Sequence, residues 1–511
     1  MIFSPATSLD ALSAEALLVF LQVGQALPSE LAAWDQAHGG TVAAVLGAGD
    51  FTGKVGSVVP IWLAGAPVRR VVLTGLGEEG TLDLEGLRAA AGEAARLVQD
   101  LGHRRVGVLL PTPASLGWEE SPAPTWAATA EAVAEGMGLA TFRYKRTRPD
   151  PEEPQAGLET AVPVAPGSSA AEVDGAVARA LAVVACIDLA RTWIVRPGND
   201  LTPARWAEET RAEASRNGLT VEVFDEHDLK RRGFRAILAV ARGSEQPPRM
   251  MVVHHRGGEA NEPPVVIVGK GVTFDSGGIG IKPSQGMERM KYDMAGGAAA
   301  LAIVLAAARL GLPVNVTAVV PAVENMPDAG ALVPNEIITT YDGLTIEVND
   351  TDAEGRVILA DAIAYGARDL GARAIVDMAT LTGAIGIALG REYAGVMGTH
   401  PGLVRGLLEA SRASGEGLWE LPLGPAHQNR FDEALRSDLA DMLNYPGREA
   451  SAITAAAFLK PFAGGRPWAH LDIAGVGWSN AARGHRIKGP TGAPVRTVLA
   501  WLAAGAPLAP R

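Results

Sequence analysis

The sequence predicts an α/β protein with two domains: a smaller N-terminal α/β domain and a larger C-terminal α/β domain. The larger domain is expected to have a central, mostly parallel or mixed sheet flanked by helices. Short apolar runs typical of buried strands alternate with longer, alanine-rich segments of helical periodicity, which is the pattern of this class. A Pro- and acid-rich stretch, residues 147–157, separates the first alternation from the rest. With 511 residues, the chain is long enough for two or three domains.

Within the N-terminal domain, residues 71–73 and 106–110 are predicted to be buried strands, because each is a short apolar run that ends near a glycine or proline. Between them, residues 84–98 repeat apolar side chains at helical spacing. We place this domain at residues 1–165 and a connecting helix and linker at residues 166–200.

The C-terminal domain is placed at residues 201–511, after a helix predicted at residues 171–195 and a stop at residues 197–200. Thr202, followed by a proline, begins the next helix. Further strands are predicted at residues 265–268, 314–320 and 374–378, and helices at 295–310 and 356–367. Lys270 follows the first of these strands, where parallel sheets bind their ligands.

Composition excludes several classes of protein. The net charge of −12 disfavours general nucleic-acid binding, which needs a positive field. Cys186 is the only cysteine, so we expect neither a disulfide framework nor a thiolate metal cluster; its apolar surroundings indicate a core residue. The N-terminus lacks the basic segment of a signal peptide, and the longest apolar run, residues 298–308, is shorter than the about 20 residues that span a bilayer. We therefore expect a soluble, cytoplasmic protein with no membrane partner.

Histidine-based and serine-based chemistry has little support. There is no HExxH motif, and of nine histidines only His254 and His255 are adjacent. Consecutive side chains on a strand face opposite sides, so this pair would be a poor chelate and is predicted to be structural. No GxSxG turn stands near a plausible aspartate and histidine pair.

Acidic residues and lysines gather instead in Gly-rich or turn-like text beside apolar runs: Asp275, Asp293, Asp352, Glu354, Lys270 and Lys282. Such places bury charge, and a buried carboxylate needs a compensating cation. Four carboxylates carry four negative charges, which two divalent cations balance. This balance predicts a two-metal site of the kind that clamps the attacking and leaving groups of a hydrolysis. Oxygen ligands suit Mg²⁺, Mn²⁺ and Zn²⁺.

The spacing of Asp352 and Glu354 suggests one shared metal. In an extended chain, residues two apart face the same side. Gly355 is expected to let the backbone turn, and Arg356 to place a fixed cation nearby. Taken singly, each aspartate is better explained as an ordinary cap or turn residue. That explanation does not account for the lysines and the arginine in the same Gly-rich text.

Seven motifs carry a family resemblance: KGVTFDSGGIGIKP, MKYDMAGGAA, ENMPDAGA, TDAEGRVILADA, ATLTGA, HLDIAG and KGPTGAPV. In this order they resemble the leucyl aminopeptidase, or cytosol aminopeptidase, family of dinuclear metallopeptidases. The resemblance is specific over roughly residues 195–500, and a weaker similarity extends over the N-terminal domain. It implies that the C-terminal domain is a catalytic peptidase domain.

The resemblance also implies the metal ligands, for two Zn²⁺ or Mn²⁺ ions per subunit. One site would take Lys270, Asp275, Asp293 and Glu354, with Lys270 neutral. The other would take Asp275, Glu354 and both the side chain and the main-chain carbonyl of Asp352. Asp275 and Glu354 would bridge the two ions.

The catalytic and substrate-binding roles implied by the resemblance lie in the same motifs. Lys282 would remain charged and polarise the scissile carbonyl, and Arg356 would hold a bicarbonate ion as general base. The substrate pocket would include Met290, Thr380, Leu381, Gly383 and Ala474, with the Leu381 carbonyl holding the substrate backbone. These residues suit a leucine-like side chain, although core packing alone would also explain several of them. The implied activity is the release of N-terminal leucine or other apolar residues from peptides with a free N-terminus, by a homohexamer.

Departures and alternatives remain open. The family most often has asparagine at the position of Asp350 and leucine at that of Val357. One alternative is a DNA-binding or regulatory protein with a secondary peptidase activity, with residues 143–148 as the basic patch; the acidic residues that follow favour a solvated linker. The other is a pseudo-enzyme scaffold, against which the full set of ligands, Lys282 and Arg356 argues.

Overall fold

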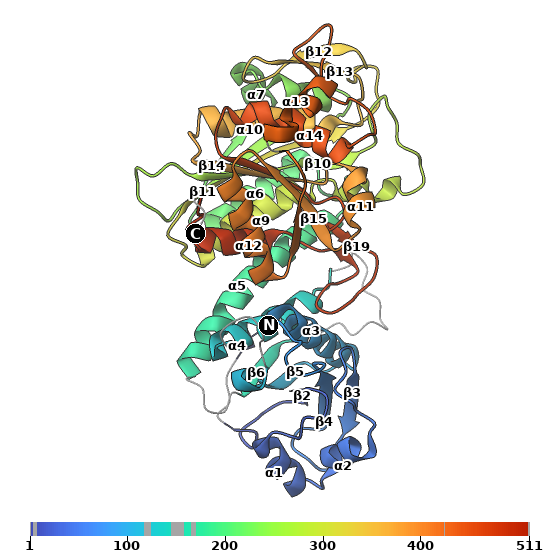
Figure 1. Cartoon of the computed structure of the whole chain (residues 1–511), viewed down its shortest axis with the longest axis vertical. Coiled ribbons are helices and arrows are strands. Elements are labelled where there is room, and N and C mark those ends of the chain that lie inside the picture. The colour runs from blue at the N-terminus through green and yellow to red at the C-terminus, as the bar shows by residue number, and fades with distance from the viewer. Residues whose placement is uncertain are drawn as a thin grey trace. The chain divides into compact units, whose positions relative to one another are not determined.

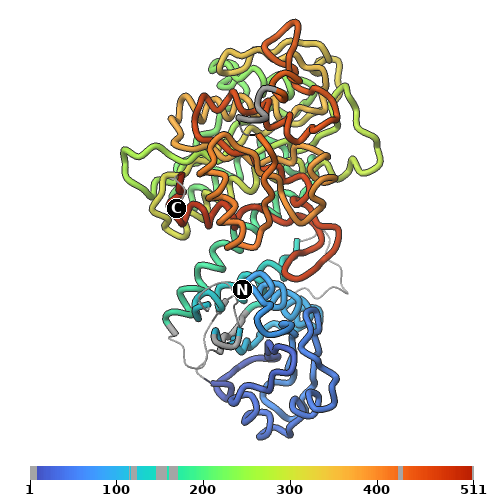
Figure 2. Tube along the Cα trace, in the orientation of Figure 1, coloured from blue at the N-terminus to red at the C-terminus, as the bar shows by residue number. Residues whose placement is uncertain are grey.

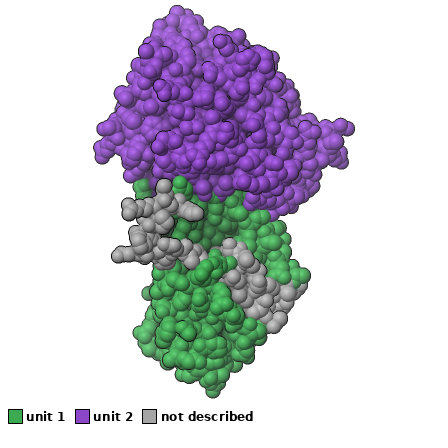
Figure 3. All heavy atoms as spheres, turned by 180° about the vertical axis from the view of Figure 1, so that it is seen from behind, with its two compact units in different colours: residues 1–188, 480–488 green, residues 189–479, 489–511 purple. Residues whose placement is uncertain are grey.

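The computed structural model describes residues 2–3, 8–116, 124–144, 158–164, 170–423 and 425–508. Two compact units make up the chain (Figure 3). The N-terminal unit comprises residues 1–188 and 480–488, and the C-terminal unit comprises residues 189–479 and 489–511. The division falls inside helix α5 (Ala170–Val195), which is the helix predicted at residues 171–195.

The N-terminal unit is built on a six-stranded sheet in the order β1-β6-β5-β2-β4-β3. Its pairs are parallel except for β3 with β4. The strands are β1 (Ile2–Phe3), β2 (Ala16–Leu21), β3 (Val58–Trp62), β4 (Arg70–Gly75), β5 (Arg105–Leu109) and β6 (Thr160–Val164). The helices are α1 (Ser29–Ala37), α2 (Thr41–Ala48), α3 (Leu84–Asp100), the 3-10 helix η1 (Pro113–Leu116), α4 (Trp126–Ala140) and the start of α5.

Two apolar cores cover the two faces of this sheet. On one face, alternate residues of β2 such as Ala16 and Leu18 pack with α3 and α4. On the other, Leu17 and Val19 pack with α1 and α2. Successive side chains of a strand point to opposite faces, so this fully apolar strand is buried on both. The predicted helix at 84–98 and the predicted strands at 71–73 and 106–110 are confirmed, within one or two residues at their ends.

The C-terminal unit is built on a nine-stranded sheet in the order β16-β15-β18-β14-β9-β11-β8-β7, with β10 paired to β11. Figure 2 traces the chain of this unit from green to red. The central pairs β18-β14, β14-β9 and β9-β11 are parallel, and antiparallel strands flank them, so the sheet is mixed as predicted. The strands are β7 (Thr220–Phe224), β8 (Arg249–Arg256), β9 (Val265–Gly269), β10 (Gly271–Asp275), β11 (Asn315–Asn325), β14 (Ala374–Ala379), β15 (Tyr393–Gly398), β16 (Gly417–Glu420) and β18 (Trp468–Asp472).

Helices and two small sheets complete this unit. The helices are α6 (Pro203–Arg216), α7 (Glu226–Arg232), α8 (Arg235–Ala241), η2 (Met287–Tyr292), α9 (Ala295–Arg309), α10 (Glu354–Arg368), α11 (Gly383–Leu389), α12 (Pro401–Ser414), α13 (Pro425–Ala434), α14 (Ser451–Leu459), η3 (Lys460–Ala463) and α15 (Val495–Ala503). The small sheets pair β12 (Glu336–Thr339), β13 (Thr345–Val348) and β17 (Met442–Leu443), and β19 (Trp478–Ser479) with β20 (Gly489–Pro490). In Figure 1, α10, α13 and α14 lie on one side of the large sheet, and α9 and α12 on the other.

Helix α9 explains the longest apolar run of the sequence. Residues 295–307 of this helix are all buried, because small alanines let it lie close against β9, β11 and β14. The stretch Met287–Arg309 is long and apolar enough to cross a membrane by length and composition, but 83% of its apolar window is buried inside the protein. Core packing therefore accounts for its apolar composition.

Asp361 ties α10 to two neighbouring segments. Its fully buried carboxylate accepts hydrogen bonds from the backbone N–H groups of Ala236 (3.0 Å), Ile237 (3.2 Å) and Tyr341 (2.7 Å). We expect Asp361→Ala to lower the free energy of unfolding by on the order of 3–5 kcal/mol, because these donors lose their acceptor in the interior. Asp361→Asn, which keeps one acceptor oxygen, should lose less. Urea unfolding of the two variants checks this, and equal stability of Asp361→Ala and the parent would contradict it.

Candidate active site

Three parallel strands end at one edge of the large sheet and bring distant parts of the chain together. Because β9, β14 and β18 run parallel, their carboxyl ends meet at the same edge. Lys270 follows β9, Thr380 follows β14, and Asp472 closes β18. Asp275 ends β10, which pairs with β11 in the same sheet. The expected position of Lys270 beside the end of a parallel strand is therefore confirmed.

A cavity of about 360 Å³ lies among these residues. Its lining comprises Lys270, Asp275, Lys282, Met290, Tyr292, Asp293, Asp350, Asp352, Ala353, Arg356, Thr380, Leu381, Thr382, Gly383, Gly386, Tyr445, Ser451 and Ala474. Every candidate site residue of the sequence analysis is in this lining except Glu354, which contacts Lys270 and is only 1% exposed. Segments as far apart in the sequence as Lys270 and Ala474 thus share one pocket.

The carboxylates and lysines form a tight charge cluster. Lys270 Nζ lies 2.6 Å from Asp293 Oδ2 and 2.8 Å from Glu354 Oε1, and it donates a hydrogen bond to the Thr380 carbonyl at 3.3 Å. Lys282 Nζ lies 2.7 Å from Asp275 Oδ2 and also contacts Asp352 Oδ1. The two lysine ammonium groups offset part of the negative charge of the four carboxylates in this arrangement.

Local backbone geometry holds Asp275 in place. Gly277 and Gly278, which follow it, have φ of 88° and 66°, conformations that favour glycine. Asp275 Oδ1 accepts hydrogen bonds from the Gly277 N–H and from Asn325 Nδ2, both at 2.9 Å. A side chain on Gly277 would also meet Asp352 Oδ1 at 2.8 Å. The Ser-Gly-Gly turn therefore gives Asp275 its donors and leaves room for Asp352.

The cluster fits divalent metal ions. Carboxylate oxygens of Asp275, Asp293 and Glu354 all lie within 4.8 Å of one another. Glu354 Oε2 is buried, and within the described part of the chain it has no hydrogen-bond partner. A buried carboxylate oxygen without a donor is costly, and oxygen ligands of this kind suit Mn²⁺, Mg²⁺ or Zn²⁺.

Burial and crowding of like charges disturb the protonation of these groups. Burial and the neighbouring Asp275 raise the pKa of Glu354, and burial raises the pKa values of Asp293 and Asp352. Burial alone would lower the pKa of Lys270, but the facing carboxylates outweigh it and raise that pKa. Raised pKa values mean that burial disfavours the anionic form of these carboxylates, and a bound cation would stabilise that form.

Two sequence-based explanations of this region are wrong in detail. Asp352 and Glu354 do not lie on an extended strand, because Asp352 is in a turn and Glu354 is the first residue of α10. Nor does Gly355 serve to turn the backbone, since it lies inside the helix. A Cβ on Gly355 would lie 2.5 Å from Lys270 Cε. The glycine makes room for the lysine.

Arg356 points a buried guanidinium group toward the cavity. Its Nη1 donates to the Asn444 carbonyl at 2.9 Å, and its guanidinium carbon lies 5.7 Å from the centre of the Tyr445 ring. Its Nε is buried and unpartnered as far as the structure describes the chain. Burial lowers the pKa of Arg356 to about 10, so it stays a cation at neutral pH. Such a group can hold a small anion.

The candidate substrate-pocket residues lie on two neighbouring segments and on η2. Thr380 Oγ1 donates to Asp293 Oδ1 at 2.6 Å, which links the pocket wall to the charge cluster. Gly383 begins α11, where Thr382 accepts the Ile385 N–H at 3.3 Å. Met290, in η2, is half-buried, and so is Ala474 after β18.

Some residues of the site were missed by sequence reasoning. Asn325 and Asp472 stand inside the quoted motifs ENMPDAGA and HLDIAG. The available signal was that both are hydrogen-bonding side chains within motifs of the site. Tyr445 and Asn444 lie in a segment without any periodic pattern, so nothing local pointed to them. Asp350 lines the cavity, and its Oδ1 accepts the Asp352 N–H at 2.9 Å.

Other predicted features lie apart from this cavity. His254 contacts Thr317 and Glu222, and His255 contacts the Leu312 carbonyl, so neither pairs with the other as a chelate. Of the basic patch, residues 145–148 lie outside the described residues, and Arg143 forms an ion pair with Asp100 at 3.1 Å.

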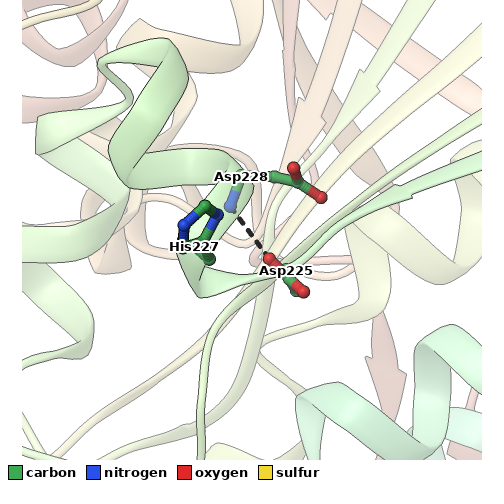
Figure 4. A group of neighbouring side chains, drawn as sticks. All are labelled: Asp225, His227 and Asp228. Carbon is green, nitrogen blue, oxygen red and sulfur yellow. Dashed lines mark hydrogen bonds between the residues drawn. The ribbon is translucent and has the colours of Figure 1, made fainter.

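A second acidic group, Asp225, His227 and Asp228, lies at the start of α7 (Figure 4). Asp225 and His227 are exposed, and Asp225 Oδ1 accepts the Asp228 N–H at 2.9 Å. This is the geometry of a helix N-cap, so capping of α7 accounts for Asp225 and no bound ligand is needed to explain it.

The chain is similar to known proteins over most of its length. Residues 188–499 match the model of the cytosol aminopeptidase family, catalytic domain, and residues 16–151 match that of its N-terminal domain. The chain is 40% identical over 479 residues to a probable cytosol aminopeptidase of Geobacter sulfurreducens, covering 93% of each chain. It is 42% identical over 473 residues to one of Acidithiobacillus ferrooxidans, covering 92% of this chain and 91% of the other.

Solved structures give the same result. The bottromycin maturation enzyme BotP in complex with Mn is 34% identical, with a TM-score of 0.82 over 96% of this chain and 100% of the other. A mutant of tomato leucine aminopeptidase is 31% identical, with a TM-score of 0.85 over 98% of this chain and 96% of the other. Both the family models and the relatives cover most of the sequence, so the chain belongs to the cytosol aminopeptidase family of metal-dependent hydrolases.

Proposed function

We propose that this aminopeptidase releases N-terminal leucine or other apolar residues from peptides, with two divalent metal ions per subunit. The observation that carries the proposal is one cavity of about 360 Å³ lined by Lys282, Arg356, the pocket wall and every candidate ligand except Glu354, which contacts the lining residue Lys270. The expected ions are Zn²⁺ or Mn²⁺. We also propose a cytoplasmic homohexamer that acts on peptides with a free N-terminus.

In this proposal, Lys270, Asp275, Asp293, Asp352 and Glu354 hold the metal ions. When bound, two such ions supply Lewis-acid stabilisation and a readily deprotonated water. The orphaned Glu354 Oε2 and the mutual approach of the carboxylates support this donor set. Lys270 would act as a ligand only in its neutral form, with the metal providing the positive charge that the ammonium provides here.

Lys282 and Arg356 would act on the substrate and on the base. The Lys282 side chain is 21% exposed, against 4% for Lys270, so its ammonium can face a carbonyl in the cavity. A cation placed there stabilises the developing oxyanion. Arg356 would hold a bicarbonate ion, the general base, through its unpartnered Nε.

Side-chain selection is assigned to Met290, Thr380, Leu381, Gly383 and Ala474. These residues present apolar atoms and small side chains to the cavity, which would accept a leucine-like group. The Leu381 carbonyl would hold the substrate backbone. Of the basic patch considered for DNA binding, the described Arg143 is paired with Asp100.

We expect the protein to hydrolyse leucine p-nitroanilide, to lose this activity after exhaustive chelation and to regain it with Zn²⁺, Mn²⁺ or Co²⁺. The N-acetylated substrate should be inert, because the free amine is expected to bind a metal. Release of p-nitroaniline, with and without chelator, measures this. Undiminished turnover in the metal-free protein, or turnover of the acetylated compound, would overturn the proposed function.

A further inference from the structure

Asp472 is a fully buried carboxylate that neither lines the cavity nor belongs to the proposed metal ligands. It ends β18 and accepts three hydrogen bonds. Its Oδ1 accepts the backbone N–H groups of Leu381 and Ala474, each at 3.2 Å. Its Oδ2 accepts the Thr382 hydroxyl at 2.6 Å.

The three donors share one property: each belongs to a residue that lines the cavity. Leu381 and Thr382 lie in the segment after β14, and Ala474 lies in the segment after β18. Regular pairing between these two strands ends close by, with the Ile473 N–H donating to the Ala379 carbonyl at 2.8 Å. Beyond that point, the Asp472 side chain joins the two segments of the pocket wall.

Burying a carboxylate of this kind costs free energy unless other groups interact with it. Burial raises the pKa of Asp472, and the nearby His470 and the three hydrogen bonds act in the opposite direction. Its hydrogen bonds offset part of that cost, and a hydrogen bond to a charged group is stronger than a neutral one. Hydrogen bonds from both segments to one side chain therefore fix the distance between them more firmly than a residue without such bonds would.

We propose that Asp472 is a positioning residue that sets the width of the side-chain pocket, and thereby the preference for leucine over smaller N-terminal residues. It acts through Leu381, Thr382 and Ala474 and touches no substrate atom itself. This inference rests on the proposed aminopeptidase function.

The same pair of strands offers a matched control in Asp377. This carboxylate, also fully buried, lies deeper on β14, opposite His470 of β18. Its Oδ1 lies 2.6 Å from His470 Nδ1, and its Oδ2 accepts the Trp468 indole N–H at 2.8 Å. None of these residues lines the cavity. Asp377 thus joins the same strands without holding the pocket wall.

The test is the ratio of kcat/KM for leucine p-nitroanilide to that for alanine p-nitroanilide, with metal content per subunit measured alongside. For Asp472→Ala we expect the ratio to fall roughly tenfold, mainly through a higher KM for the leucine substrate, because a widened pocket loses apolar contact. Metal content should stay unchanged. Asp472→Asn keeps one oxygen whose two lone pairs can accept both N–H groups, and it should retain the ratio within about threefold. Asp377→Asn should retain it too.

Three outcomes would overturn the inference. One is an unchanged ratio in Asp472→Ala, and another is an equal fall in Asp377→Asn. If Asp472→Ala does not fold, Thr382→Val takes its place, because it removes one of the three donors at nearly constant volume. The ratio should fall in Thr382→Val and should be restored in Thr382→Ser. No change in Thr382→Val is the third. A parent enzyme inactive on both substrates would instead refute the proposed function.

Discussion

Replacing Glu354 with alanine is expected to lower kcat/KM by at least about 10³-fold and to strip metal from the subunit. In the proposed arrangement Glu354 bridges both ions, so its loss weakens both sites, and a metal centre contributes several kcal/mol of transition-state stabilisation. Its side chain is 1% exposed, and Lys270 Nζ lies 2.8 Å from its Oε1. Water has little access to replace the lost oxygens.

Asp352→Ala should cost less. The Asp352 side chain is 35% exposed, and the main-chain carbonyl that we assign as a further ligand survives the substitution. Elemental analysis of metal per subunit and steady-state kinetics rank the two variants. Asp350→Asn is the matched control, because it removes a carboxylate from the same cavity outside the proposed ligand set while keeping an acceptor for the Asp352 N–H. Greater loss of metal in Asp352→Ala than in Glu354→Ala would show that bridging and terminal ligands are assigned wrongly.

The parts of the fold that follow from local pattern were predictable from sequence. Residues 265–268 form a continuous apolar run and residues 374–378 form a run interrupted by Asp377, as expected of strands buried on both faces, and they are β9 and β14. The alanine-rich helix α9 was equally clear, with its end placed within one residue. Strand neighbours were not predictable, because the order of strands depends on long-range pairing that leaves no local signal.

The site residues also fall into two groups: those that the local sequence indicated and those that it did not. Lys270 and Asp275 stand beside strand ends or Gly-rich turns, so the surrounding sequence indicated that they were candidate site residues. Tyr445 contributes to the cavity from a segment with no period or motif. The reason for Gly355 was also beyond the sequence, since it depends on where the Lys270 side chain passes. Sequence-based reasoning selected residues that the fold brings together at one cavity, but it predicted the wrong backbone conformation for Asp352 and Glu354.

Lys282→Ala is expected to keep its metal ions and to lose roughly 10²–10³-fold in kcat, the loss seen when one oxyanion donor is removed. Lys270→Ala should instead lose metal at one site, and excess metal should partly restore its activity. The two lysines stand twelve residues apart in the sequence, yet their surroundings differ. Lys270 is held by two carboxylates and a carbonyl in the interior, while Lys282 reaches the cavity from a partly exposed loop.

Arg356→Ala separates positioning of the base from both of these roles. It should keep its metal ions like Lys282→Ala, with a milder loss of kcat, because Arg356 is proposed only to hold the bicarbonate ion. Arg356 is buried and bonded to the Asn444 carbonyl, so thermal unfolding must first show that the variant is folded. Metal content and kcat of the three variants then decide. If Lys282→Ala loses metal while Lys270→Ala retains it, the two roles are exchanged. Lys282 would then be the metal ligand, and Lys270 would be the lysine that faces the substrate.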